Sequence, residues 1–209
     1  MQVLSMRLVE DIPVEEVAPR VNAQLSSALG LVTAARADRK FHAGFSANGK
    51  EYRYRLVTPV AAAQRPQWRQ WAWEADFDET RLREALALFP GTRNYIGFSQ
   101  KADPQHLRTV SALEVETLQS GVLDLRVHGS GFAKYMIRYI VSAAVLYAQQ
   151  KVSLQQVVDA LETGAHLKAD KAPAQGLVLW QVKYPPELDP FSAEERARAA
   201  LPAGLPFFV

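Results

Sequence analysis

The stretch Glu51-Tyr52-Arg53-Tyr54-Arg55-Leu56-Val57 carries the strongest structural pattern in this 209-residue chain. Apolar or aromatic residues alternate there with arginines. Successive side chains of a β-strand point to opposite faces, so the pattern predicts a strand with Tyr52, Tyr54 and Leu56 on one face. The two arginines are predicted to lie on the other face.

Downstream, the sequence predicts a helix followed by a hairpin. Asp78 has the position of an N-cap for a helix over residues 79–89. Residues 108–118 and 122–128 are predicted to be antiparallel strands that are joined by a turn at Ser120-Gly121.

Two further helices and a last strand are predicted after the hairpin. Residues 134–150 are apolar almost all round, which predicts a buried helix. Ser153 and Gln156 have the spacing of a capping box, which predicts a helix over residues 154–163. Residues 177–184 form the last predicted strand.

With one extra helix set aside, this order is the β-α-β-β-α-β arrangement of a ferredoxin-like unit, in the α+β class. Upstream, residues 2–8 and 31–35 are predicted to be strands on either side of a helix over residues 14–29. We therefore predict a remnant of an N-terminal ferredoxin-like half over residues 1–45 and a C-terminal ferredoxin-like domain over residues 46–184. The two are predicted to share one antiparallel sheet, and residues 185–209 are a predicted Pro-rich tail.

Composition excludes several classes of protein. Apolar residues make up 48% of the chain and charged residues 22%, as in a soluble globular protein. The longest apolar run, around residues 140–148, is shorter than the roughly 20 residues that a membrane span needs. The chain has no cysteine, which excludes disulfides and thiol catalysis. No signal peptide opens the sequence, so a cytoplasmic location is expected.

Charge and motifs leave few alternatives. The net charge is +2, and the basic residues between positions 36 and 69 fit a solvated face as well as a nucleic-acid partner. The four histidines His42, His106, His128 and His166 have no paired spacing, so no metal site is expected. Gly129-Ser130-Gly131 stands where a dinucleotide-binding loop would, but Lys134 replaces the third glycine of that motif.

Five blocks of sequence together resemble the tRNA pseudouridine synthase A family. They are residues 41–47 (FHAGFSA), 50–55 (KEYRYR), 108–110 (RTV), 129–141 (GSGFAKYMIRYIV) and 171–177 (KAPAQGL). The resemblance implies two ferredoxin-like halves in one antiparallel sheet with a basic cleft, working as a homodimer. It also implies isomerisation of a uridine of the tRNA anticodon arm to pseudouridine, with no cofactor, and no membrane partner.

The resemblance gives roles to two residues. Tyr52 matches the family's base-stacking tyrosine, which holds the extruded pyrimidine. Periodicity alone favours a packing partner of Tyr54 and Leu56, and the match to the family motif reverses that preference. Arg138 matches the arginine that pairs with the family's catalytic aspartate; the alternative is a structural ion pair with a nearby acid.

Other basic residues are candidates for RNA contacts. Lys50, Arg53, Arg55 and Lys134 are predicted to meet phosphates, with surface solvation as the alternative.

The sequence departs from the family at the nucleophile. The family's Gly-Arg-Thr-Asp-x-Gly-Val-His-Ala run, which supplies the catalytic aspartate, has no match here, and Asp38 is not expected to replace it. We expect the chain to be an N-terminally truncated synthase that is inactive as printed. Either its start is misplaced and the full protein is an ordinary enzyme, or the chain is a non-catalytic, ferredoxin-like RNA-binding remnant. Gly44 and Ser99 depart from the family's usual arginines, which puts some RNA contacts in doubt.

Overall fold

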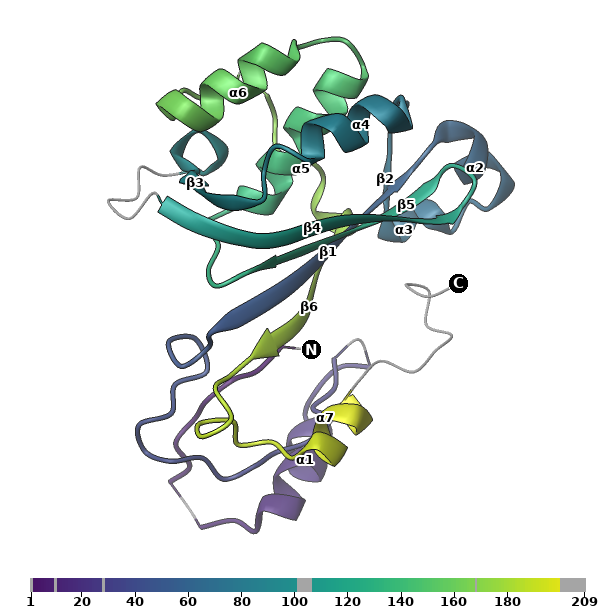
Figure 1. Cartoon of the computed structure of the whole chain (residues 1–209). Coiled ribbons are helices and arrows are strands. Elements are labelled where there is room, and N and C mark those ends of the chain that lie inside the picture. Colours follow the sequence, from purple (N-terminus) through teal and green to yellow (C-terminus); the bar gives the residue numbers. More distant parts are fainter. Residues whose placement is uncertain (1, 10, 28, 101–106, 168, 200–209) are drawn as a thin grey trace. The chain divides into compact units, whose positions relative to one another are not determined.

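The strand predicted around Tyr52 is β1 (Gly49–Val57), and it pairs with three other strands (Figure 1). The computed structural model describes residues 2–9, 11–27, 29–100, 107–167 and 169–199. These residues fall into two compact units. Residues 49–181 form one, named here the sheet unit, and residues 1–48 with 182–209 form the other, the terminal unit. The domain boundaries expected at residues 45 and 184 stay predictions.

The sheet has six strands in an α+β arrangement. Its other strands are β2 (Trp73–Glu74), β3 (Gly91–Asn94), β4 (Leu107–Gln119), β5 (Val122–Gly129) and β6 (Leu177–Lys183). The order is β2-β1-β5-β4-β3, and β6 also pairs with β1. β1 is antiparallel to β5 but parallel to β2, so the expectation of a purely antiparallel sheet is wrong. The short β2 follows two helical turns, and this connection brings it back in the direction of β1.

The predicted hairpin is confirmed as the antiparallel pair of β4 and β5. β4 and β5 are joined at Ser120-Gly121, where Gly121 has a φ of +76°. A side chain at Gly121 would also meet the Thr58 hydroxyl oxygen at 2.3 Å, so both the turn and the close contact require glycine.

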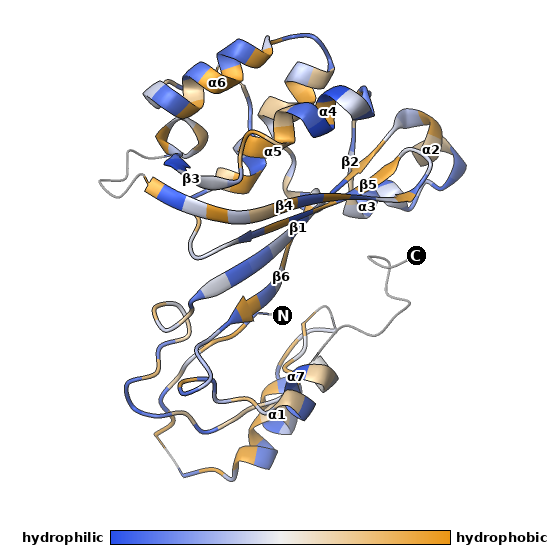
Figure 2. Ribbon diagram, in the orientation of Figure 1, coloured by the Kyte–Doolittle hydropathy of each residue, from blue (hydrophilic) through white to orange (hydrophobic). Residues whose placement is uncertain are grey.

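Three helices lie on one face of the sheet, as Figure 1 shows: α4 (Glu79–Leu86), α5 (Met136–Ala148) and α6 (Leu154–Thr163). The Asp78 carboxylate accepts a hydrogen bond from the Arg81 N–H, as its predicted N-cap role requires. The capping box of Ser153 and Gln156 is also present. Figure 2 shows α5 as apolar along much of its length, and it is almost wholly buried against the sheet.

The main core lies between these helices and the sheet. Tyr54 and Leu56 of β1 pack there with Leu125 of β5 and Ile140 of α5. A smaller apolar cluster involves Val57 of β1, Val122 of β5 and the region of α2 (Pro59–Gln64) and α3 (Trp68–Trp71). None of the described helices has the length and apolarity to cross a bilayer.

The terminal unit has helices but lacks the predicted strands. It contains α1 (Val14–Asn22) and α7 (Ala193–Ala199). The strands predicted over residues 2–8 and 31–35 are absent, and so is support for a partial ferredoxin-like half over residues 1–45. α1 ends at Asn22 rather than at residue 29 because the Asn22 side-chain amide exchanges two hydrogen bonds with the Leu31 backbone.

Helix α7 is held to residues 182–189 within the terminal unit. Arg196 of α7 donates to both carboxylate oxygens of Asp189 and to the Val182 carbonyl, and its guanidinium lies over the Tyr184 ring. The Tyr184 hydroxyl in turn donates to the Ala43 carbonyl.

Candidate functional site

Tyr52 lies on the face of β1 that the helices cover, and its ring is half-buried. The ring packs edge-on against Phe132, with the two centroids 5.2 Å apart. Burial raises the pKa of the Tyr52 hydroxyl, so it stays protonated at neutral pH. Gly129 makes this contact possible, because a Cβ there would lie 2.8 Å from the Phe132 ring and 2.5 Å from the Thr109 carbonyl oxygen. Gly129 and Phe132 of the GSGF block therefore support Tyr52.

Arg138 lies in the first turn of α5 and is tied to the segment 171–177. Its Nε donates to the Ala172 carbonyl at 2.5 Å, and the Ala172 N–H donates back to the Arg138 carbonyl at 3.2 Å. The Tyr54 hydroxyl donates to the Pro173 carbonyl at 2.8 Å. The KAPAQGL block is thus held to α5 and to β1, and it fixes the Arg138 Nε. Among the described residues, Arg138 forms no ion pair with a carboxylate within 4.0 Å.

Three basic side chains surround the ring of Tyr135, which directly precedes α5. The Lys171 Nζ lies 4.4 Å from the ring centroid, and the Lys134 Nζ and the Arg138 Cζ each lie 5.2 Å from it. Lys134 is exposed, and Lys171 and Arg138 are half-buried. This arrangement gathers positive charge at the start of α5, where it can attract an anionic ligand.

Arg53 and Arg55 lie on the other face of β1 and are held by internal carboxylates. The Arg53 Nε lies 3.0 Å from a Glu51 oxygen, and its Nη1 lies 3.4 Å from Asp124. Its guanidinium also stacks over Trp180, 3.6 Å from the ring centroid. Arg55 is 2% exposed and its Nη2 lies 3.7 Å from Asp124, so a phosphate cannot reach it in this structure.

The buried ion pair of Arg55 and Asp124 has pKa values that are shifted mainly by desolvation. Burial raises the pKa of the Asp124 carboxyl, although Arg55 and Arg53 oppose that rise. Burial also lowers the pKa of the Arg55 guanidinium, although Asp124 opposes that fall. Both directions show that removal from water outweighs the attraction between the two charges.

The structure therefore separates the predicted site residues into two groups. The first group is Tyr52 and Lys50 on the helix-facing side of β1, with Arg138 and Lys134 near the start of α5. The second group is Arg53 and Arg55 on the other face of β1. Sequence reasoning missed Lys171 and Tyr135. Both stand inside quoted blocks, but their proximity across 36 positions of sequence is a tertiary contact that no local pattern reveals.

The remaining candidates have structural explanations. The His42 Nδ1 accepts hydrogen bonds from the N–H groups of Gly44 and Phe45, so it organises a turn. The described residues contain no group of three or more side chains that could hold a metal ion, and His106 lies outside the described residues. Ser99 is 2% exposed, and its hydroxyl donates to the Ile96 carbonyl.

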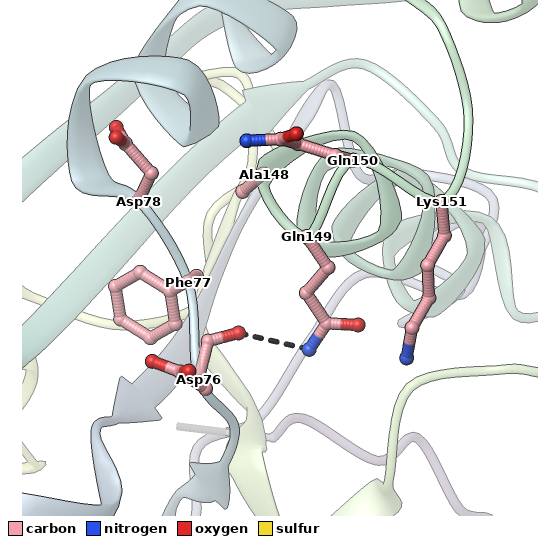
Figure 3. Close-up of a pocket in the computed structure, with 7 residues that line it drawn as sticks. All are labelled: Asp76, Phe77, Asp78, Ala148, Gln149, Gln150 and Lys151. Atoms are coloured by element: carbon pink, nitrogen blue, oxygen red, sulfur yellow. Dashed lines mark hydrogen bonds between the residues drawn. The ribbon is translucent and has the colours of Figure 1, made fainter.

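A pocket of about 490 Å³ lies at the other end of α5 (Figure 3). Asp76, Phe77 and Asp78 line one side of it, and residues 148–151 line the other. The Gln149 side-chain amide donates to the Asp76 carbonyl across it. Ala148 follows Arg138 by ten residues, so the pocket lies on the order of 15 Å from that arginine and is separate from Tyr52.

Comparisons with known proteins agree on one family. A family model described as tRNA pseudouridine synthase matches residues 85–185. A tRNA pseudouridine synthase A of Geobacillus kaustophilus (strain HTA426) is 35% identical over 173 residues, which are 80% of this chain and 66% of the relative. One of Geobacillus sp. (strain WCH70) is 33% identical, over 78% of this chain and 67% of the relative. One of Frankia casuarinae is 28% identical, over 95% of this chain and 73% of the relative. The chain spans about two thirds of the length of these relatives.

Proposed function

The chain belongs to the tRNA pseudouridine synthase A family, and from this we propose that it serves the isomerisation of uridine to pseudouridine in the anticodon arm of tRNA. The reaction cuts the glycosidic bond of the target uridine, turns the uracil and joins one of its carbons to the same sugar. The chain's own contribution is to hold the base and to place a cation beside the nucleophile.

The observations that carry the proposal are the contact of Tyr52 with Phe132 and the hydrogen bond of Arg138 to Ala172, in segments that the family motifs cover. An aromatic ring that Phe132 holds edge-on is suited to stack an extruded pyrimidine. Arg138 uses Nε for the Ala172 carbonyl, and its other nitrogens are suited to receive a carboxylate. Such a guanidinium would lower the carboxyl pKa, so that the acid remains a charged nucleophile.

The proposed architecture follows the same family. The strand order β6-β1-β5-β4, with α4 and α5 on one face, supports a ferredoxin-like βαββαβ unit in the sheet unit. We also propose a homodimer and a cytoplasmic location, because the family resemblance implies the first and a tRNA substrate favours the second.

A second candidate is a non-catalytic RNA-binding module. The printed residues contain no Gly-Arg-Thr-Asp-x-Gly-Val-His-Ala run, so they include no candidate that matches the family's nucleophile. Both candidates require that the chain binds tRNA through Tyr52, and they differ only in turnover.

The test is to add the purified 209-residue chain to an unmodified tRNA transcript and to measure binding and pseudouridine separately. We expect binding without pseudouridine. We expect Tyr52→Ala to weaken binding by roughly 5- to 150-fold, which corresponds to about 1–3 kcal/mol for one stacked base.

The matched control is Tyr52→Phe, which keeps the ring and is expected to bind nearly as the unchanged chain does. Equal affinity for the alanine and phenylalanine variants, with the fold intact, would remove Tyr52 from the binding site. Pseudouridine above background would show that the chain has a nucleophile of its own. If no pseudouridine forms, the intact mass of the endogenous protein would show whether a nucleophile lies in a longer chain.

A further inference from the structure

The basic cluster at the start of α5 consists of Lys134, Lys171 and Arg138 around the Tyr135 ring. Each charged group lies within 5.2 Å of the ring centroid, so any two of them are no more than about 10 Å apart. Like charges this close repel each other. Among the described residues none of the three forms an ion pair with a carboxylate, so the protein does not neutralise the cluster itself.

The backbone of Tyr135 is arranged to hold the ring between these cations. Tyr135 has φ +64° and ψ +10°, a left-handed conformation that a tyrosine rarely adopts. Such strain persists only where the surroundings enforce it, and it gathers at ligand sites. The negative faces of the ring attract the cations and lessen their mutual repulsion. The strained tyrosine thus keeps three positive charges together.

The location of the cluster indicates what kind of ligand it takes. It stands at the N-terminal end of α5, where the helix dipole also favours an anion. Phe132, which contacts the Tyr52 ring, precedes Tyr135 by only three residues. The cations occupy the ring faces of Tyr135, which leaves the ring unsuited to stack a base. Lysine ammonium groups are point charges that suit phosphate oxygens.

We propose that Lys134 and Lys171, held together by Tyr135, bind a backbone phosphate of the RNA next to the base that Tyr52 stacks. Arg138, with its Nε fixed by Ala172, remains directed to the nucleophile. The inference rests on the proposed function, because it assigns a second contact to the same RNA. It adds Lys171 and Tyr135 to the residues that position the substrate.

The experiment measures the affinity of the 209-residue chain for an unmodified tRNA transcript over a range of salt concentrations. Each phosphate contact contributes about 0.7 to the slope of log K against log salt for single strands, and about 0.9 for duplex. Lys171→Gln is expected to lower the slope by about that amount. Lys171→Arg keeps the charge and is expected to restore the slope. Tyr135→Leu is expected to lower the slope in the same direction, because it removes the ring that gathers the cations.

The matched control is Lys151→Gln, an exposed lysine just beyond the other end of α5. It is expected to leave the slope unchanged. If Lys171→Gln folds normally and has the slope of the unchanged chain, the phosphate site is wrong, and a loss of binding in Tyr52→Ala would still uphold the proposed function. If the unchanged chain binds no tRNA, the proposed function and this inference both fail.

Discussion

Arg55 and Asp124 are charged side chains that are each about 2% exposed, on the face of the sheet opposite to Tyr52. The two residues are register partners on β1 and β5, so the strand pairing itself brings their charges together. The Arg55 guanidinium also lies over the Trp68 ring, at 5.1 Å from the centroid. The alternation of arginine along β1 predicts an exposed face, but Trp68 and Trp180 cover it. A pattern of alternation therefore locates a strand without showing which of its faces water reaches.

Replacement of Asp124 by alanine is expected to destabilise the fold strongly. It removes the carboxylate while the buried Arg55 charge remains, which typically costs about 3–5 kcal/mol in the free energy of unfolding. The double variant Arg55→Met/Asp124→Leu is expected to recover most of that loss, because apolar side chains of similar size need no solvation. Urea unfolding measures both, with Glu114→Ala on the exposed face of β4 as a control within about 0.5 kcal/mol of the unchanged chain. A double variant as unstable as the single one would contradict this account.

At the scale of elements, segment 171–177 contacts both α5 and β1, and its hydrogen bond to Arg138 fixes the Nε of that side chain. Gly176 allows this approach, because a Cβ there would lie 2.8 Å from the Tyr54 ring and 3.0 Å from the Arg55 carbonyl oxygen. The ring is held in place by its own hydrogen bond to Pro173. A Cβ at position 176 would therefore force the backbone to shift, because no flexible side chain could move out of its way.

Gly176→Ala is expected to cost about 1–3 kcal/mol of stability through overpacking. Because the displaced segment carries Ala172 and Lys171, the variant is also expected to weaken tRNA binding. Gly131→Ala is the matched control from the neighbouring loop, since a Cβ there meets nothing within 4 Å. Thermal unfolding and tRNA affinity, measured on both variants, check the prediction. Equal stability of the two variants would show that segment 171–177 does not depend on this contact.

The elements that sequence predicts well are those with a local signal. The Ser120-Gly121 turn, the Asp78 cap and the Ser153 capping box each fix an element through neighbouring residues. β3 was missed because its four residues are mostly exposed and show no apolar alternation. At the site, the family motifs identified Tyr52 and Arg138, whereas Lys171 depends on how segment 171–177 folds back onto α5.

At the scale of the whole molecule, the two units differ in how much side-chain surface they bury. Ten residues of α5 are buried in the sheet unit, whereas α1 in the terminal unit buries none. Leu4 and Met6 alternate as in a strand, which produced the prediction over residues 2–8, yet they are 73% and 65% exposed. Alternation yields a strand only when another strand accepts its hydrogen bonds, and residues 2–8 have no such pairing.

This difference predicts a graded stability that hydrogen exchange of the full 209-residue chain can measure. Amides of residues 11–27 are expected to open with free energies of about 0–2 kcal/mol, because little buried surface protects α1. Amides of β5 and α5 are expected to open only with unfolding of the sheet unit, at roughly 5–15 kcal/mol. Low concentrations of urea should then reduce protection in α5 and leave α1 nearly unchanged, because only unfolding of the sheet unit exposes much new surface. Equal protection of α1 and α5, with equal response to urea, would mean that the chain unfolds as one cooperative body and that the burial difference has no energetic consequence.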